Sequence, residues 1–188
     1  GEMRGISVLR KKINISSVEG MNVDQNGTAY IRLVQFTSRS GGEFKEAISD
    51  LKEKGMKRLI LDLRDNSGGL LSAAIEITEC FLSKGQLIVS IKGRKANDVR
   101  DYHSNTEENL SDIPMVILMN EGSASASEIV GGALSVLDRA PIIGEQSFGK
   151  GSVQTIFPME DESGLRLTTA MYFLPDGSTI HEEGIKPQ

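Results

Sequence analysis

The 188-residue sequence has little of what several classes of protein require. Its single cysteine, Cys80, excludes an internal disulfide bond and a zinc site built from cysteines. Only two histidines are present, which is too few for a histidine-rich metal site. We therefore expect no metal and no other cofactor. Because Cys80 falls in an apolar helical pattern, we interpret it as a buried packing thiol.

Aromatic rings and positive charge are also scarce. The sequence has no Trp, 3 Tyr and 6 Phe, and its 21 Lys and Arg are outnumbered by 26 Asp and Glu, for a formal charge of −5. Nucleic-acid surfaces need clustered basic residues and stacking rings. We therefore expect no nucleic-acid partner.

Long apolar runs are absent. The longest, Met115–Met119, is far shorter than the ~20 residues of a membrane-spanning helix. The first residues also lack the basic stretch and apolar stretch of a signal peptide. The sequence therefore predicts neither a membrane span nor a signal peptide within these residues.

Strand and helix patterns alternate along the chain, which indicates a single α/β domain with crossover helices. Apolar residues at helical spacing predict the helices, and alternating or continuous apolar runs predict the strands. The expected strands cover residues 6–13, 28–36, 57–63, 86–92, 115–119, 141–143, 153–157 and 165–173, the expected helices carry residues 44–51, 71–82 and 126–137, and residues 93–112 read as polar and irregular.

Three loops rich in glycine or serine follow predicted buried strands, at residues 64–69, 122–128 and 144–151. Sites in α/β domains gather at the carboxyl ends of strands. Together the loops offer a serine nucleophile, a lysine base and backbone N–H groups for an oxyanion, which are the parts of an acyl-transfer site.

Each loop also has a plainer interpretation. The 144–151 loop matches a phosphate-binding loop until Gly151, where Ser or Thr is required, and a strand pattern follows instead of a helix, so we reject nucleotide binding. Lys150 alone could be a solvated loop lysine. Ser125 with Glu128 forms a capping-box pattern, and Ser123 and Ser127 could have similar roles.

Several motifs occur in a fixed order from about residue 28 to the end. They are Tyr30-Ile-Arg-Leu33, Leu61-Asp-Leu-Arg-Asp-Asn-Ser-Gly-Gly69, Gly122-Ser-Ala-Ser-Ala-Ser-Glu-Ile129, Phe148-Gly-Lys-Gly-Ser-Val-Gln154, Leu167-Thr-Thr-Ala-Met-Tyr172, and Pro175-Asp-Gly177 with Gly184-Ile-Lys-Pro187. In these motifs the chain resembles the C-terminal processing peptidases, or tail-specific proteases. The resemblance implies a fold similar to Clp protease and crotonase, and a serine endopeptidase with a Ser–Lys dyad.

The resemblance assigns a role to each matching residue. Ser125 maps to the nucleophile, Lys150 to the general base, and Gln154 to the residue that orients the lysine. The backbone N–H groups of Gly69 and Ala126 map to the oxyanion hole, with Gly68 as the alternative to Gly69. No metal takes part.

A lysine acts as a base only as the neutral amine, while an ordinary lysine has a pKa of ~10.4. Bringing a lysine close to neutrality requires a shift of roughly 3 units, or about 4 kcal/mol, which burial can supply if no carboxylate approaches. We therefore expect the lysine to be buried, and Asp65 and Glu145 to point away from it.

The resemblance also sets expectations for the rest of the protein. Residues 15–188 would form one catalytic core, and residues 1–14 would be a strand leaving a missing PDZ domain, so that the core alone is weakly active. The substrate would be an unfolded or extended protein with apolar C-terminal residues, bound as an added strand in an extracytoplasmic compartment. Oligomeric state is not predicted. The rival interpretations are a crotonase-like enzyme acting on acyl-CoA and a catalytically silent peptide-binding scaffold.

Overall fold

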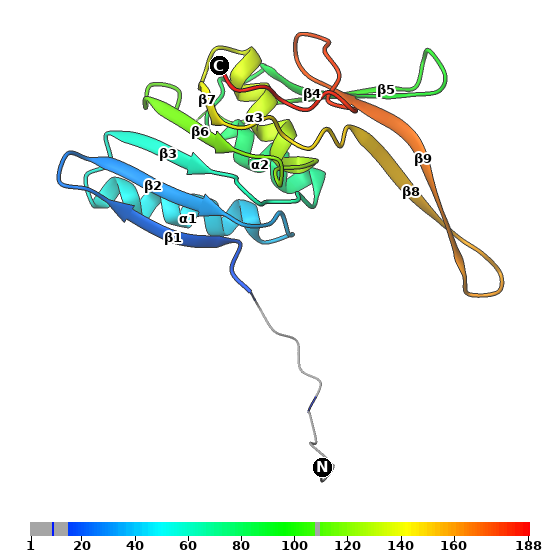
Figure 1. Cartoon of the computed structure of the whole chain (residues 1–188), viewed down its shortest axis with the longest axis horizontal. Helices are drawn as coiled ribbons and strands as arrows, with labels where there is room; N and C mark the ends of the chain where they lie inside the picture. Colours follow the sequence, from blue (N-terminus) through cyan, green and yellow to red (C-terminus); the bar gives the residue numbers. More distant parts are fainter. Residues whose placement is uncertain (1–8, 10–14, 108–109) are drawn as a thin grey trace.

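The computed structural model describes residue 9 and residues 15–107 and 110–188 (Figure 1). The expected strand at residues 6–13 therefore lies outside the described residues, apart from residue 9. The elements are β1 (Val18–Val23), β2 (Thr28–Leu33), α1 (Ser40–Glu53), β3 (Arg58–Asp62), α2 (Leu71–Glu79), β4 (Leu87–Gly93), β5 (Val99–His103), β6 (Met115–Met119), α3 (Ala126–Val136), β7 (Ile142–Gly144), β8 (Ser152–Pro158) and β9 (Gly164–Phe173).

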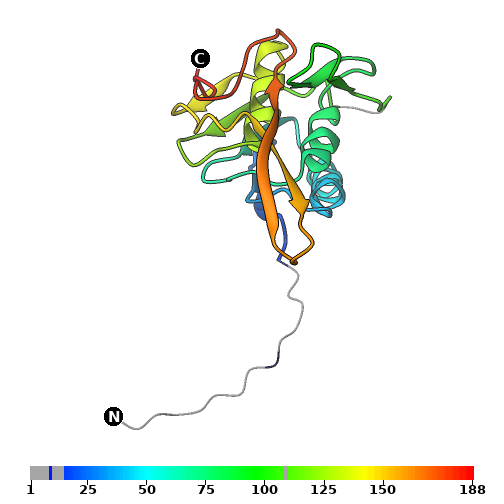
Figure 2. The same ribbon diagram turned by 90° about the vertical axis from the view of Figure 1, so that its right-hand side faces the viewer.

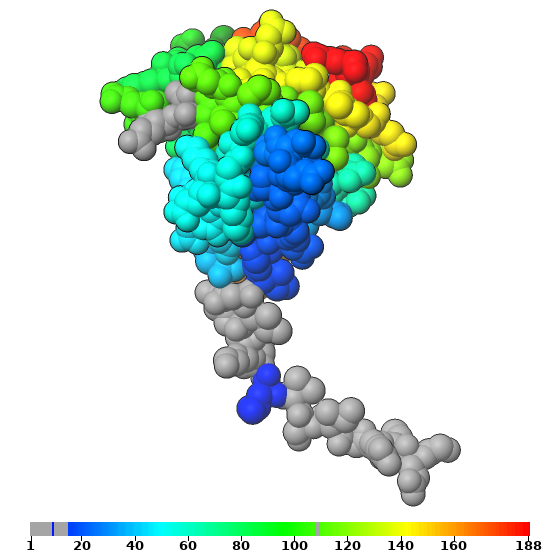
Figure 3. All heavy atoms as spheres, turned by 90° about the vertical axis from the view of Figure 1, so that its left-hand side faces the viewer, coloured from blue at the N-terminus to red at the C-terminus, as the bar shows by residue number. Residues whose placement is uncertain are grey.

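The first sheet has five strands in the order β1-β2-β3-β6-β7. Strands β2, β3, β6 and β7 are parallel, and β1 joins β2 as an antiparallel edge strand. The β1–β2 hairpin is the blue block in the middle of the face seen in Figure 3. The parallel strands are linked through α1, α2 and α3, which are crossover connections. The predicted α/β class is confirmed.

The three helices cover one face of this sheet (Figures 1 and 2), and the core lies between them. Alternate residues of β2 and β6 are buried, which fits strands with one face against the helices. The helix predicted at 44–51 is α1, and Gly55 follows its end with a φ of +87°, the left-handed conformation that glycine adopts readily.

The second sheet is antiparallel, with the order β5-β4-β9-β8. Strand β4 contacts α2 and α3, so this sheet packs on the helices. Beyond β4, strands β8 and β9 continue as a long two-stranded arm (Figures 1 and 2). Strand β5 was missed in the sequence because its residues are mostly polar and exposed, so no apolar alternation marks it.

No helix within the described parts of the chain is both long and apolar enough to cross a membrane.

Candidate active site

The three glycine- and serine-rich loops meet at one edge of the first sheet. Loop 64–69 follows β3, loop 122–128 follows β6, and loop 144–151 follows β7. These strands are parallel neighbours, so their carboxyl ends lie together. The topology therefore brings the three candidate loops into one place, as the sequence predicted.

The three candidate serines differ in burial and in the hydrogen bonds of their hydroxyls. Ser123 and Ser127 are fully buried, and their hydroxyls donate to the carbonyl oxygens of Leu63 at 2.8 Å and Asn66 at 2.8 Å. Ser125 is half-buried. Its backbone has φ +56° and ψ −112°, a strained conformation for a residue with a side chain. Strain of this kind costs on the order of 1–3 kcal/mol and is concentrated at functional sites.

Ser125 is also the N-cap of α3, and the predicted capping box with Glu128 forms. The Ser125 N–H donates to Glu128 Oε2 at 2.7 Å. The capping and nucleophile interpretations are therefore compatible, because a helix N-terminus stabilises negative charge that develops beside it.

The buried Glu128 carboxylate also binds the lysine loop. Glu128 Oε1 accepts the Ser147 hydroxyl at 2.6 Å and the Gly149 N–H at 2.6 Å, and Oε2 accepts the Lys150 N–H at 2.9 Å. The backbones of Ser125 and Lys150 thus meet at one carboxylate oxygen. The sequence pattern predicts only a local capping role for Glu128, because local spacing carries no information about contacts with residues 147–150.

The candidate oxyanion donors can be compared by their hydrogen bonds. The N–H of Gly68, which is buried, already donates to Asn66 Oδ1 at 2.9 Å. Among the described residues, the N–H groups of Gly69 and Ala126 have no hydrogen-bond partner, and Gly69 is exposed. This difference favours Gly69 over Gly68.

Asn66 holds the glycine turn against the serine loop, a role that sequence analysis did not assign. Its side-chain Nδ2 donates to the Leu33 carbonyl at 2.7 Å, and its own carbonyl accepts the Ala124 N–H at 3.0 Å. Asn66 is fully buried, and its side-chain amide both donates and accepts a hydrogen bond, which satisfies its polar atoms. The signal available in the sequence was only its place in the Asn-Ser-Gly-Gly turn.

The expectation of a buried lysine is wrong for this structure: Lys150 is exposed, and so is Gln154. Among the described residues, the side chains of Ser125, Lys150 and Gln154 make no hydrogen bonds to one another. The loop backbone is fixed at Glu128, but the side chain of Lys150 faces solvent because the chain turns outward into the exposed β8–β9 arm.

Asp65, as expected, is engaged elsewhere. Its Oδ2 lies 3.5 Å from Arg32 Nη2, and its Oδ1 accepts Asn120 Nδ2 at 2.9 Å. In the described part of the chain, no ion pair joins Lys150 to Asp65 or to Glu145.

Asp62, at the end of β3, is fully buried. Its carboxylate accepts Arg64 Nη2 at 2.7 Å, Arg64 Nε at 3.0 Å and the Tyr30 hydroxyl at 2.7 Å. Burial by itself would raise the pKa of Asp62, but the hydrogen bonds from Arg64 and Tyr30 outweigh it and hold the pKa below its ordinary value.

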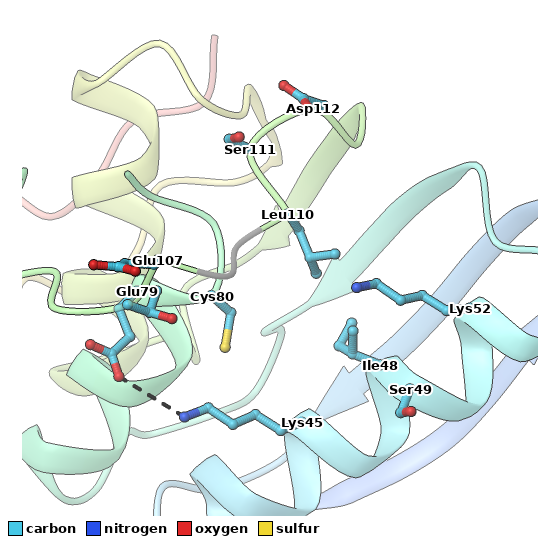
Figure 4. Close-up of a pocket in the computed structure, with 11 residues that line it drawn as sticks. Lys45, Ile48, Ser49, Lys52, Glu79, Cys80, Glu107, Leu110, Ser111 and Asp112 are labelled. Carbon is cyan, nitrogen blue, oxygen red and sulfur yellow. Dashed lines mark ion pairs between the residues drawn. The ribbon is translucent and has the colours of Figure 1, made fainter. Parts of the chain in front are cut away.

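A separate cavity of about 670 Å³ lies between α1, the end of α2 and residues 106–107 and 110–112 (Figure 4). It contains Cys80, and Lys45 Nζ lies 4.0 Å from Glu79 Oε1 beside it. Cys80 is only partly buried, although it packs against the core as predicted. Burial raises the pKa of this thiol to about 11, so the reactive thiolate is rare at neutral pH.

The described residues contain no group of three or more His, Cys, Asp and Glu side chains that could hold a metal ion.

Comparison with known proteins connects this geometry to a family. The sequence model of peptidase family S41 matches residues 27–188. A carboxy-terminal-processing protease of Bartonella bacilliformis is 46% identical over 97% of this chain and 42% of its own length. A probable CtpA-like serine protease of Staphylococcus aureus is 37% identical over 99% of this chain and 37% of its own length. The chain thus spans about two-fifths of these relatives.

Solved structures agree with the sequence matches. The photosystem II D1 C-terminal processing protease superposes with a TM-score of 0.83 at 32% identity, over 95% of this chain and 49% of that one. A putative S41 protease from Bacteroides fragilis has a TM-score of 0.79 at 19% identity, over 94% of this chain and 51% of that one. The second likeness concerns the fold alone.

Proposed function

The chain belongs to peptidase family S41, and from this premise we propose that it is the catalytic core of a serine endopeptidase that cleaves proteins near their C-termini. The names of its relatives, which include a carboxy-terminal-processing protease, support this reaction class. The proposed catalytic pair is Ser125 and Lys150.

One observation carries the assignment: the backbones of Ser125 and Lys150 donate to the same oxygen, Glu128 Oε2, at 2.7 and 2.9 Å. A nucleophile and a base must lie close enough for a proton to pass between them. The strained and half-buried position of Ser125 adds support, because Ser123 and Ser127 are buried and bonded to carbonyls.

In the proposed reaction the neutral amine of Lys150 takes the proton of the Ser125 hydroxyl as Oγ attacks the peptide carbonyl. The N–H groups of Gly69 and Ala126 stabilise the oxyanion. The lysine then gives its proton to the leaving amine, which leaves an acyl-enzyme, and water hydrolyses the ester by the same base. Gln154 orients the lysine through its uncharged amide.

The exposure of Lys150 fits a site that is completed by its substrate. A polypeptide bound over the loop would exclude water from Lys150 and favour the neutral amine. The loop backbone is held at Glu128, so rotation about the side-chain bonds of Lys150 would bring its amine toward Ser125.

The proposed substrates are unfolded or extended proteins, and the proposed compartment is extracytoplasmic. Both rest on membership of the family. Residues 15–188 would act as one catalytic core.

The test is labelling with a fluorophosphonate probe and cleavage of fluorescent casein by the unmodified chain and by Ser125→Ala and Lys150→Ala. Both substitutions should lower cleavage by at least 10³-fold. Ser83→Ala and Lys54→Ala, at exposed positions outside the three site loops, serve as controls and should be unaffected. Cleavage that survives Ser125→Ala would contradict the assignment and would make Ser123 or Ser127 the next candidate nucleophile.

A further inference from the structure

Loop 147–150 is tied to the candidate nucleophile by a buried polar cluster that goes beyond the dyad. We define the Glu128 cluster as Glu128, Ser147 and the backbones of Ser125, Gly149 and Lys150. Glu128 is 0% exposed and Ser147 is 7% exposed. Every contact of the carboxylate in this cluster is with a donor, which suits its ionised form.

Four donors share the two oxygens in pairs. Oε1 accepts the hydroxyl of Ser147 and the N–H of Gly149, and Oε2 accepts the N–H groups of Ser125 and Lys150. A buried carboxylate with fewer partners would be costly, since hydrogen bonds must replace the lost water. The carboxylate therefore holds the lysine loop and the start of α3 in one fixed relation.

Ser147 extends this cluster to the C-terminal segment. Its hydroxyl accepts the Ile185 N–H at 2.6 Å while donating to Glu128, and its own N–H donates to the Ile185 carbonyl at 3.0 Å. The Glu182 N–H donates to the Gly149 carbonyl at 2.9 Å on the other side of the loop. Hydrogen bonds thus hold the loop to α3 on one side and to residues 182–185 on the other.

We propose that Ser147 and Glu128 are positioning residues, which act through the backbone of Lys150 to set the distance between the lysine amine and the Ser125 hydroxyl. The inference rests on the proposed function of the dyad. Ser147 touches neither reacting group, so its effect would pass only through Glu128 and the loop. A misplacement of about 1 Å can cost on the order of 10²-fold in rate.

The first measurement is the rate of fluorophosphonate labelling of Ser125 between pH 6 and 10, together with kcat and KM for fluorescent casein. Ser147→Ala removes one hydrogen bond and no charge, so the plateau rate should fall at least tenfold while the midpoint of the pH profile stays in place. KM should change less than threefold. A purely structural role would lower the amount of folded protein without changing the rate per folded molecule.

Glu128→Gln should have a larger effect than Ser147→Ala. Its NH2 group is a donor, and it would replace a carboxylate oxygen that accepts two hydrogen bonds. Its labelling rate should fall by about 10²-fold. The double variant with Ser147→Ala and Glu128→Gln should be labelled almost as fast as Glu128→Gln alone, because Ser147 acts through the Glu128 carboxylate.

Matched controls distinguish an effect on the position of Lys150 from a general loss of stability. Ser135 is as buried as Ser147, at 7%, and lies on α3 as Glu128 does, but its hydroxyl accepts a hydrogen bond from the Gln188 side chain. Glu43 accepts the Ser17 N–H at 2.6 Å near the start of α1. Ser135→Ala and Glu43→Gln should label at the rate of the unmodified chain, even where they lower its melting temperature.

The inference is overturned if Ser147→Ala and Glu128→Gln, folded by circular dichroism, label as fast as the controls. If the unmodified chain is not labelled, the proposed function fails instead, and amide hydrogen exchange then decides the cluster. The amides of Gly149 and Lys150 should be protected in the unmodified chain and should exchange at least tenfold faster in Glu128→Gln. Equal exchange in both proteins would overturn the inference.

Discussion

At the residue scale, the close approach of Gly68 to the candidate nucleophile leaves no room for a side chain. A Cβ on Gly68 would lie 2.6 Å from the Ala124 carbonyl oxygen and 2.9 Å from the Ser125 Cβ, and its φ of +95° suits glycine. Only glycine therefore lets loop 64–69 support the strained backbone of Ser125.

We expect Gly68→Ala to destabilise the protein by about 1–3 kcal/mol and to slow labelling of Ser125, since the serine loop has to shift. The measurements are urea denaturation and fluorophosphonate labelling. Gly42→Ala is the control, because an added Cβ meets nothing within 4 Å there and the residue lies in α1. It should stabilise the fold by about 0.5–1 kcal/mol. A Gly68→Ala variant as stable and reactive as Gly42→Ala would contradict the packing.

At the element scale, the β8–β9 arm carries an apolar face with no core beneath it. The register pairs Phe157 with Leu165 and Thr155 with Leu167, so Phe157, Leu165 and Leu167 share one face. Their exposed fractions are 43%, 47% and 46%. A two-stranded hairpin is marginally stable by itself, so it depends here on the continuation of β9 beside β4.

We expect replacement of both Leu165 and Leu167 by Thr to change the free energy of unfolding by less than about 0.5 kcal/mol each, because these side chains are half exposed and Thr suits strands. Binding of a hydrophobic dye and self-association at high concentration should decrease. The control is Ile117→Thr in β6, which is 0% exposed and should cost on the order of 2 kcal/mol. A large loss of stability in the arm variant would mean that this face is covered in solution.

At the scale of the whole molecule, acid stability depends on carboxylates with lowered pKa values. Hydrogen bonds within exposed turns lower the pKa of Asp24, Asp161 and Asp176. The pKa of the buried Asp62 is also lowered, because its hydrogen bonds from Arg64 outweigh the effect of burial. A carboxylate with a lower pKa in the folded chain stabilises it above the unfolded pKa of about 3.9, and this contribution disappears as the pH falls toward the folded pKa.

The free energy of unfolding should therefore fall steeply below about pH 4. Asp62→Asn should be less stable at pH 7 by on the order of 1–3 kcal/mol, and its difference from the unmodified chain should shrink toward pH 3. Urea denaturation at pH 3 to 7 measures both effects. Asp50→Asn, an exposed position on α1, is the control. A difference that stays constant with pH would show that Asp62 acts by shape and not by charge.

Residue pattern was enough to predict the elements with strong apolar spacing and the three loops that form the candidate site. Strands β3 and β6 and helices α1 and α3 could be predicted because their apolar residues follow regular spacing, which depends only on neighbours along the chain. The motifs around Ser125 and Lys150 also identified the family before any contact was known.

The tertiary structure alone decided what depends on contacts between distant residues. It distinguished Ser125 from Ser123 and Ser127 by burial, favoured Gly69 over Gly68 by hydrogen bonding, and left Lys150 exposed where burial was expected. It also joined Glu128 to a loop about twenty residues away. Local spacing cannot carry this information, because strand order in the sheet sets which loops meet.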